Sequence, residues 1–209
     1  MIKEKNMKTK LITLLLAFAV MPAFAGVSGH VGYTSDYMWR GQSQSLGGGA
    51  FQAGVDLEYQ GWYVGTWASE VDFGDDTASF EYDLYTGYNF QMSDKLSMKV
   101  GVMQYRWDDN DLEMVEEAFM QIKSPLLDFG YAVDTDDSDK DYMEAGLNVP
   151  FIKVVDVKFV YGRFHDDSTW KGLMLHKSWE KFDLGLMIMK DAKEMQFSDN
   201  ASLTLSYNL

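Results

Sequence analysis

Residues 50–73 read AFQAGVDLEYQGWYVGTWASEVDF, and the alternation within this stretch decides the fold class. Apolar and polar residues change places at every position up to Tyr59, which is the period of a β-strand with two different faces. The apolar face of this first half comprises Phe51, Ala53, Val55, Leu57 and Tyr59. Gln60-Gly61 then suits a two-residue turn. The stretch therefore predicts a β-hairpin.

The second half of the stretch is less regular. We expect its apolar face to comprise Tyr63, Trp67, Val71 and Phe73. Thr66, Glu70 and Asp72 then lie on the opposite, polar face. The same period continues along the chain, and no segment after residue 25 has the pattern of a long amphipathic helix.

Twelve strands are predicted in all. They cover residues 27–40, 49–59, 62–73, 80–90, 96–107, 113–123, 128–134, 141–149, 154–164, 170–179, 182–190 and 201–209. Within 96–107 the apolar parity changes between Val102 and Tyr105, which predicts a β-bulge.

The links between these strands alternate between two kinds. Short links such as Gln60-Gly61 and Glu180-Lys181 alternate with polar, acidic ones such as DTDDSDK at 134–140. Short turns at one end and more polar loops at the other are typical of an outer-membrane β-barrel. Because the loops are modest in length, we expect no large plug or lid.

The first 25 residues have the three parts of a secretory signal peptide. A basic start, MIKEKNMKTK, precedes an apolar run and the small-residue ending of MPAFA. This pattern predicts cleavage after Ala25. Met7 is an alternative start, since the sequence from there alone makes a complete signal. We therefore expect residues 1–25 to be a signal peptide and residues 26–209 a single outer-membrane barrel domain.

Charge narrows the possible partners. The chain carries 18 Lys and Arg against 32 Asp and Glu. Four Lys and one Glu belong to the expected signal, which leaves 14 cations against 31 acids. A chain this acidic repels nucleic acid, so a nucleic-acid partner is not expected. With no Cys, the chain offers neither disulfides nor thiol chemistry.

The end of the chain, ASLTLSYNL at 201–209, alternates up to the final Leu209. Terminal alternation of this kind is similar to the signal that the barrel-insertion machinery reads. We therefore expect the protein in the outer membrane of a Gram-negative bacterium. A closed barrel is expected there, because closure pairs every backbone amide in lipid. A soluble β-sandwich, whose core also alternates, is the alternative.

If the apolar parity faces lipid, the other parity lines the interior. Eight candidates for the lumen and for selectivity follow: Asp36, Arg40, Asp56, Glu58, Glu70, Asp72, Glu81 and Asp83. Tyr37 and Trp39 share the lipid-facing parity and are expected at the outer interface. Arg40 needs anionic neighbours, for which Glu70, Asp72, Glu81 and Asp83 are the candidates. Arg40 could shape a constriction or simply hold strands together.

The N-terminal third also resembles a known family. YTSDYMWRGQSQS at 33–45, the stretch 51–76 and EYDLYTGYNF at 81–90 together resemble the TorF-type porin family of Gram-negative bacteria. The likeness covers residues 32–90, and GGG stands at 47–49 where the family has a Pro. The resemblance implies an outer-membrane barrel with a porin role and gives no substrate.

The prediction from sequence is therefore a porin-like channel for passive diffusion of small hydrophilic solutes or ions, with a preference for cations. The alternative is a closed structural or interaction barrel that binds lipopolysaccharide or a partner through its external loops. The expected partners are outer-membrane lipid, lipopolysaccharide, the insertion machinery and small solutes or cations. The three His and the Asp clusters lack catalytic or metal-site spacing, so we expect no enzyme, cofactor or metal.

Overall fold

The structure is a computed structural model, and it describes residues 26–74, 78–109, 112–191 and 200–209. The predicted signal peptide lies outside these residues. The described residues form fourteen strands. These are β1 (Gly26–Thr34), β2 (Met38–Trp39), β3 (Gln42–Ser43), β4 (Ala50–Tyr59), β5 (Trp62–Glu70), β6 (Phe80–Ser93), β7 (Leu96–Trp107), β8 (Val115–Lys123), β9 (Leu127–Asp134), β10 (Asp141–Asn148), β11 (Asp156–Phe164), β12 (Thr169–Trp179), β13 (Phe182–Asp191) and β14 (Asn200–Asn208).

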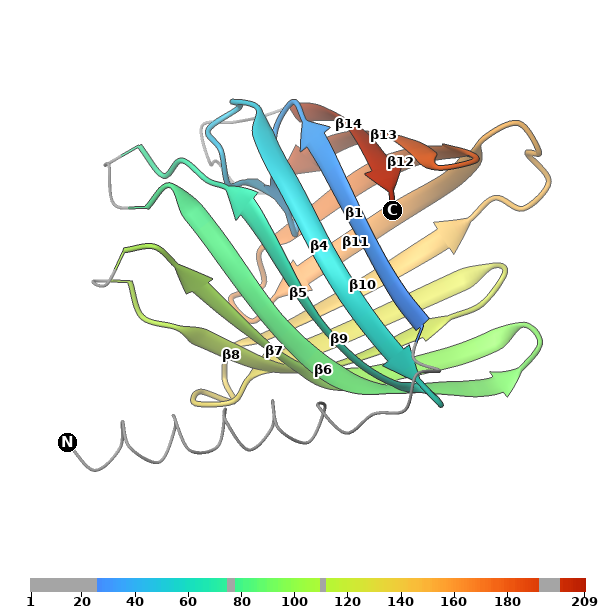
Figure 1. The fold of residues 1–209 in the computed structure, drawn as a ribbon, viewed down its shortest axis with the longest axis horizontal. Coiled ribbons are helices and arrows are strands. Elements are labelled where there is room, and N and C mark those ends of the chain that lie inside the picture. Colours follow the sequence, from blue (N-terminus) through green and yellow to red (C-terminus); the bar gives the residue numbers. More distant parts are fainter. Residues whose placement is uncertain (1–25, 75–77, 110–111, 192–199) are drawn as a thin grey trace.

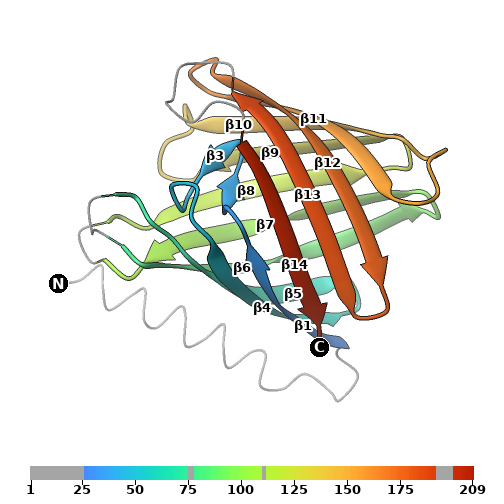
Figure 2. The ribbon, with the colours of Figure 1, turned by 90° about the horizontal axis from the view of Figure 1, so that it is seen from above.

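Twelve of these strands close into one antiparallel barrel (Figures 1 and 2). Neighbours in sequence pair all the way from β4 to β14, and β1 completes the ring by pairing with both β14 and β4. The short pair β2–β3 forms a separate sheet. The prediction of an all-β, twelve-stranded barrel is confirmed.

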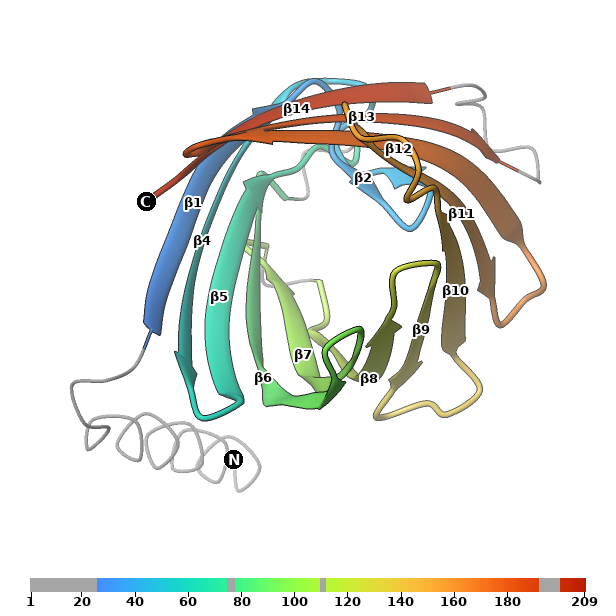
Figure 3. The same cartoon turned by 90° about the vertical axis from the view of Figure 1, so that its right-hand side faces the viewer.

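Strand bounds agree with the sequence pattern within a few residues, apart from the first strand. The alternation suggested a strand over 27–40, but β1 ends at Thr34. The backbone N–H of Ser35 still donates to Leu203 O of β14 at 2.9 Å. Beyond it the chain leaves the wall and leads to β2, which lies inside the ring of strands (Figure 3). Alternation predicts extended backbone and does not tell whether that backbone pairs with the wall.

The bulge predicted near Val102 is wrong. β7 pairs with β8 in unbroken register from Ser97↔Lys123 to Tyr105↔Val115. The change of parity has another cause, because polar side chains occupy the outward face there. Gln104 Nε2 donates to Glu116 Oε2 at 2.6 Å on the neighbouring strand, and Arg106 donates to Gln104 Oε1 at 2.8 Å. The irregularity of this sheet lies instead in β6, between Gln91 and Ser93.

The face assigned to β5 is also wrong. The two-residue link Gln60-Gly61 pairs Tyr59 with Trp62, so Trp62 continues the outward face of β4. Tyr63 therefore points inward and is only 3 % exposed. In a two-residue hairpin the length of the link fixes which parity of the second strand faces each way.

The outer surface of the barrel carries many apolar side chains. Exposed side chains include Val27, Val31, Phe51, Val55, Phe159, Ile188, Leu203 and Leu205. These residues have the outward parity of five neighbouring or nearby strands, whereas glycines and charged residues alternate with them on the inner side. No helix of the described residues is long and apolar enough to cross a membrane.

An outward position can be tested against its inward neighbour. Leu205 on β14 is 52 % exposed, and its neighbour Ser206 has the opposite parity. We expect Leu205→Arg to lower the free energy of unfolding in lipid vesicles by about 2–4 kcal/mol. Ser206→Arg is expected to cost clearly less, because its side chain reaches the interior of the barrel. Denaturant titration of both variants in vesicles measures the difference, and equal losses would contradict the assignment of faces.

Candidate functional site: an inward hairpin across the barrel

The hairpin β2–β3 lies inside the ring of strands (Figure 3). Met38 pairs with Ser43 and Trp39 with Gln42, so Arg40 and Gly41 form the two-residue tip. Both tip residues have positive φ, 47° at Arg40 and 84° at Gly41. Two consecutive positive φ angles are the requirement of a type I′ turn, which joins tightly twisted strands. The Arg40-Gly41 turn therefore closes a compact two-stranded hairpin.

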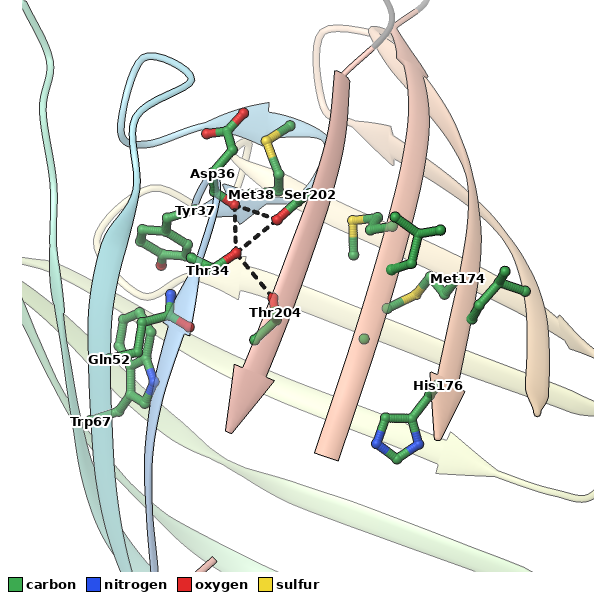
Figure 4. A pocket seen from close by; sticks show the side chains of 14 residues that line it. Thr34, Asp36, Tyr37, Met38, Gln52, Trp67, Met174, His176, Ser202 and Thr204 are labelled. Atoms are coloured by element: carbon green, nitrogen blue, oxygen red, sulfur yellow. Dashed lines mark hydrogen bonds between the residues drawn. The ribbon is translucent and has the colours of Figure 1, made fainter. Parts of the chain in front are cut away.

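The base of the hairpin is fixed to β14 by short polar side chains (Figure 4). The carbonyl oxygen of Asp36 accepts hydrogen bonds from Thr34 Oγ1 at 2.9 Å and from Ser202 Oγ at 2.6 Å. Thr34 and Ser202 also hydrogen-bond each other at 2.7 Å, and Thr204 Oγ1 donates to Thr34 Oγ1 at 3.0 Å. All of these side chains point inward, which turns the chain into the barrel.

The Asp36 carboxylate stabilises the hairpin from within. Its Oδ1 accepts from Ser43 Oγ at 2.6 Å and from Ser45 Oγ at 3.1 Å. Ser45 Oγ in turn accepts from the backbone N–H of Tyr37 at 2.9 Å. Asp36 is 5 % exposed. It is therefore a bracing residue of the loop, although the sequence had suggested that it faces the solute path.

At the tip, Arg40 reaches the opposite side of the barrel. Its guanidinium donates to both carboxylate oxygens of Glu117 on β8, at 2.7 and 2.5 Å. The guanidinium carbon also lies 4.2 Å from the ring centre of Tyr142 on β10 and 4.3 Å from that of Trp39. Two parallel hydrogen bonds to a carboxylate give both strength and a fixed orientation.

Burial and pairing act against each other on Arg40. Burial alone lowers the pKa of the guanidinium, but the hydrogen bonds with Glu117 outweigh it and hold the pKa above the ordinary value. The group is therefore charged, and the side chains of the pair are only 14 % and 11 % exposed. A charge pair this deeply buried ties the hairpin to the wall. Glu117 is the partner, so Glu70, Asp72, Glu81 and Asp83 are corrected as the ion-pair candidates.

Apolar contacts hold the two sides of the hairpin. Tyr37 packs edge-on against Trp67 and donates from its hydroxyl to Glu81 at 3.3 Å. Trp39 packs edge-on against Tyr105 of β7. On the other side, Met38 packs against the cluster around Trp170. The hairpin thus contacts walls on both sides.

Two expectations from the sequence are corrected here. Tyr37 and Trp39 lie inside the barrel, not at the outer interface, because the loop that carries them folds inward. This loop of modest length nevertheless obstructs the lumen. A two-stranded hairpin can span the interior of a twelve-stranded barrel more readily than the interior of a barrel with more strands. Loop length, on which the expectation of no large plug or lid was based, therefore did not reveal this inward hairpin.

Two of the interior cavities flank the hairpin. One, of about 350 Å³, lies between Met38 and the inner face of β12–β14. The other, of about 540 Å³, lies beside Trp39 and Arg40 against the inner face of β4–β10. The larger cavity is lined by aromatic rings together with Asp56, Asp83, Glu117 and Glu144.

Four predicted acids do have the inward parity. Asp56 accepts from Tyr85 Oη at 2.8 Å, and Asp83 lines the larger cavity. Glu81 accepts from Tyr37 and is 3 % exposed. Glu58 shares the inward parity of Asp56 and lies near the short-turn end of β4.

Two predicted acids lie elsewhere. Glu70 has the outward parity of β5, and its Oε2 accepts from the backbone N–H of Phe51 at 2.9 Å. Asp72 follows β5 in an exposed loop, where its Oδ1 accepts from the N–H of Gly74 at 2.8 Å. The position of Glu70 follows from the reversed parity of β5, and that of Asp72 from the end of β5 at Glu70.

Neither Glu117 nor Tyr142 was predicted as a partner of the hairpin. Adjacent residues of a strand face opposite ways, so one of Glu116 and Glu117 had to point inward. Nothing in the sequence indicated which side chain in the loop would meet it. Among the described residues, no group of three or more His, Cys, Asp or Glu is placed to hold a metal ion.

Comparison with known protein families assigns this chain to one of them. A family model described as "Bacterial protein of unknown function (Gcw_chp)" matches residues 22–198. The chain belongs to the Gcw_chp family. Comparison with curated proteins gives no match. The family model does not carry the TorF name, so that resemblance stays a prediction.

Solved structures, two of which are titled as porins, share the fold of this Gcw_chp protein. "KdgM porin in complex with disordered oligogalacturonate" superposes with a TM-score of 0.61 at 7 % identity, covering 87 % of this chain and 98 % of that one. "KdgM porin" gives 0.61 at 8 %, covering 86 % and 98 %. A third structure, titled "Unveiling the Mechanism Behind the in-meso Crystallization of Membrane Proteins", gives 0.60 at 9 %, covering 88 % and 83 %. At these identities the likeness concerns the fold.

The packing of the tip can be tested through Gly41. A Cβ at this position would lie 2.5 Å from Trp170 Cγ, and the backbone has φ of 84°. We expect Gly41→Val to displace the hairpin while the barrel wall still folds. Since the chain has no Cys, Gln42→Cys provides a single reactive thiol beside the tip.

The readout is the rate at which a water-soluble maleimide labels this introduced thiol in the refolded protein. Adding Gly41→Val to the thiol variant should raise the labelling rate several-fold. As a control, Gly47→Val changes a glycine whose added Cβ would meet nothing within 4 Å. Unchanged labelling with Gly41→Val would contradict the close packing of the tip.

Proposed function

We propose that this protein is a porin-like channel of the outer membrane, through which small hydrophilic solutes and ions diffuse passively. The observation that carries the proposal is a closed barrel with an apolar outer surface and a polar interior. An apolar outer band lets a barrel lie in hydrocarbon, and a polar interior of a twelve-stranded barrel accommodates water. The shared fold of the KdgM porin supports the same proposal.

The inward hairpin would set the aperture. It lies between the two cavities and is held at both ends, by Thr34 and Ser202 at its base and by Glu117 at its tip. A solute crossing the barrel would pass beside this hairpin. Size selection then depends on a few side chains of one loop, and no moving part is required.

The charge of the interior favours cations. Of the inward-facing cations, Arg40 pairs with Glu117 and Lys158 pairs with Asp128 at 2.7 Å. Lys99 lies over the ring of Tyr63 at 4.0 Å. Asp56 and Glu144 line the larger cavity beside Lys99. A solute path with excess carboxylates concentrates cations and repels anions.

The neighbouring structure helps to limit the solute. The KdgM porin structure is titled as a complex with oligogalacturonate. An oligomer of sugar acids carries one carboxylate per unit, and the acidic cavity described above would repel it. We therefore propose cations and neutral solutes for this protein, and we do not transfer the polyanionic solute.

Ion selectivity tests this proposal directly. Under a salt gradient in a planar bilayer, we expect single-channel steps with a reversal potential that favours cations. Asp56→Asn and Glu144→Gln should each lower the preference. One unit charge about 6 Å from an ion in water is worth about 0.7 kcal/mol, or about a threefold change in local ion concentration. Glu70→Gln is the matched control, because Glu70 faces outward, and it should change nothing.

Two outcomes would count against the channel. A preference for anions would contradict the role of the acidic interior. A folded barrel without conductance steps would favour the second candidate, a closed structural barrel that interacts through its loops. The observation that favours this candidate is the filling of the loop end by two apolar clusters, one around Tyr37 and Val71 and one around Tyr142 and Trp170.

A further inference from the structure

Three cations occupy outward positions on three neighbouring strands. The register pairs Tyr161 with Lys171 and Arg163 with Thr169 across β11–β12, and Lys171 with Lys190 across β12–β13. All three cations are exposed, and all have the parity of the outward-facing Phe159 and Ile188. They lie near the loop end of the barrel, opposite the short turn Glu180-Lys181. We name Arg163, Lys171 and Lys190 the basic patch.

The direct pairing of Lys171 with Lys190 is unfavourable by itself. Like charges at opposed positions of an antiparallel pair destabilise the sheet. Among the described residues, no ion pair joins either lysine to an acid. Arg163 does lie 3.1 Å from Asp167, but both side chains are exposed, at 46 % and 79 %. On the adjacent strand β10, Asp141 has the outward parity of Met143, which pairs with Arg163. An anion between the two lysines would therefore remove their repulsion.

The patch lies at the edge of the apolar surface. One outward position further from the loops, Leu173 pairs with Ile188, and the next outward pair is Leu175 with Leu186. Lysine stems can lie along such a surface while their ammonium groups reach the polar layer beside it. Because the chain has a large excess of acids, a local group of cations at this level is not a result of composition. The phosphate layer of a membrane is the polar anionic layer next to hydrocarbon.

We propose that the basic patch binds the phosphate groups of lipid A, the membrane anchor of lipopolysaccharide. The proposal rests on the outer-membrane location proposed above. There, the termini and short turns face the periplasm and the loop end faces the outer leaflet, whose lipid carries these phosphates. One phosphate bridges Lys171 and Lys190, and Arg163 adds a fork of donors beside them. The bound lipid fixes the height of β11–β13 in the bilayer.

Lipid A affinity of the refolded mature chain tests the proposal. Thermal unfolding in detergent is followed while lipid A, dephosphorylated lipid A or inorganic phosphate is added. Lipid A should raise the melting temperature of the wild type, and the other two additions should not. Lys171→Gln and Lys190→Gln should each weaken lipid A about fivefold, and the double variant about thirtyfold. Lys177→Gln is the matched control, because Lys177 has the same parity at the other end of β12.

A second readout separates binding from a structural role. Without lipid A, each lysine variant should be at least as stable as the wild type, since it loses a like-charge contact. The proposal is overturned if lipid A stabilises the double variant as strongly as the wild type. It is equally overturned if dephosphorylated lipid A acts like lipid A, or if lipid A does not stabilise the wild type. Stabilisation by inorganic phosphate would show an anion site without lipid specificity, which also overturns it.

Failure here and failure of the channel are distinguishable. The double variant should keep the wild-type conductance and ion preference, because the patch lies outside the barrel. A barrel that conducts ions but is not stabilised by lipid A would refute the proposal for the basic patch and leave the proposal of a channel intact. A barrel that does not conduct ions but binds lipid A through these lysines would refute the channel and leave the basic patch intact.

Discussion

The ion pair between Arg40 and Glu117 is the interaction on which the interior of this barrel depends. Without it, β2–β3 would be a short two-stranded hairpin, and such a pair is marginal on its own in water. The ion pair is bidentate, largely buried and flanked by the rings of Trp39 and Tyr142. Removing one partner of a buried pair leaves the other charge uncompensated, which is costly even where the intact pair adds little. The loop therefore has one well-defined position, and the two cavities follow from it.

Much of the wall could be predicted from sequence. Period-two alternation and turn residues identify twelve strands within a few residues, because in a barrel each strand has one face against the interior and one against the surroundings. The N-terminal hairpin at 50–73 shows where this reasoning ends. Its strands are evident, but Tyr63 and Trp67 were assigned to the wrong face because apolar character was equated with the outside. In a narrow barrel aromatic side chains also fill the interior, and only the two-residue turn fixes the faces.

The site itself was less predictable. Asp56, Glu58, Glu81 and Asp83 follow from parity along paired strands and do face inward. The path of residues 35–49 does not follow from parity, because it depends on contacts between segments far apart in the sequence. Ser202 meets Asp36 and Glu117 meets Arg40, over separations that no local pattern records. Gly41 was the available signal, since a glycine readily adopts the positive φ that a type I′ turn requires and that a continuous strand does not.

We propose that the hairpin, and not the wall, sets the aperture. Replacing residues 38–43 by a short glycine link keeps all twelve wall strands and removes the β2–β3 hairpin together with its ion pair. Single-channel conductance of this variant, compared with the intact protein in the same bilayer and salt, measures the aperture directly. We expect a conductance several-fold higher, with the preference for cations retained through Asp56 and Glu144. A conductance equal to that of the intact protein would show that the aperture lies elsewhere in the barrel and that the hairpin does not set it.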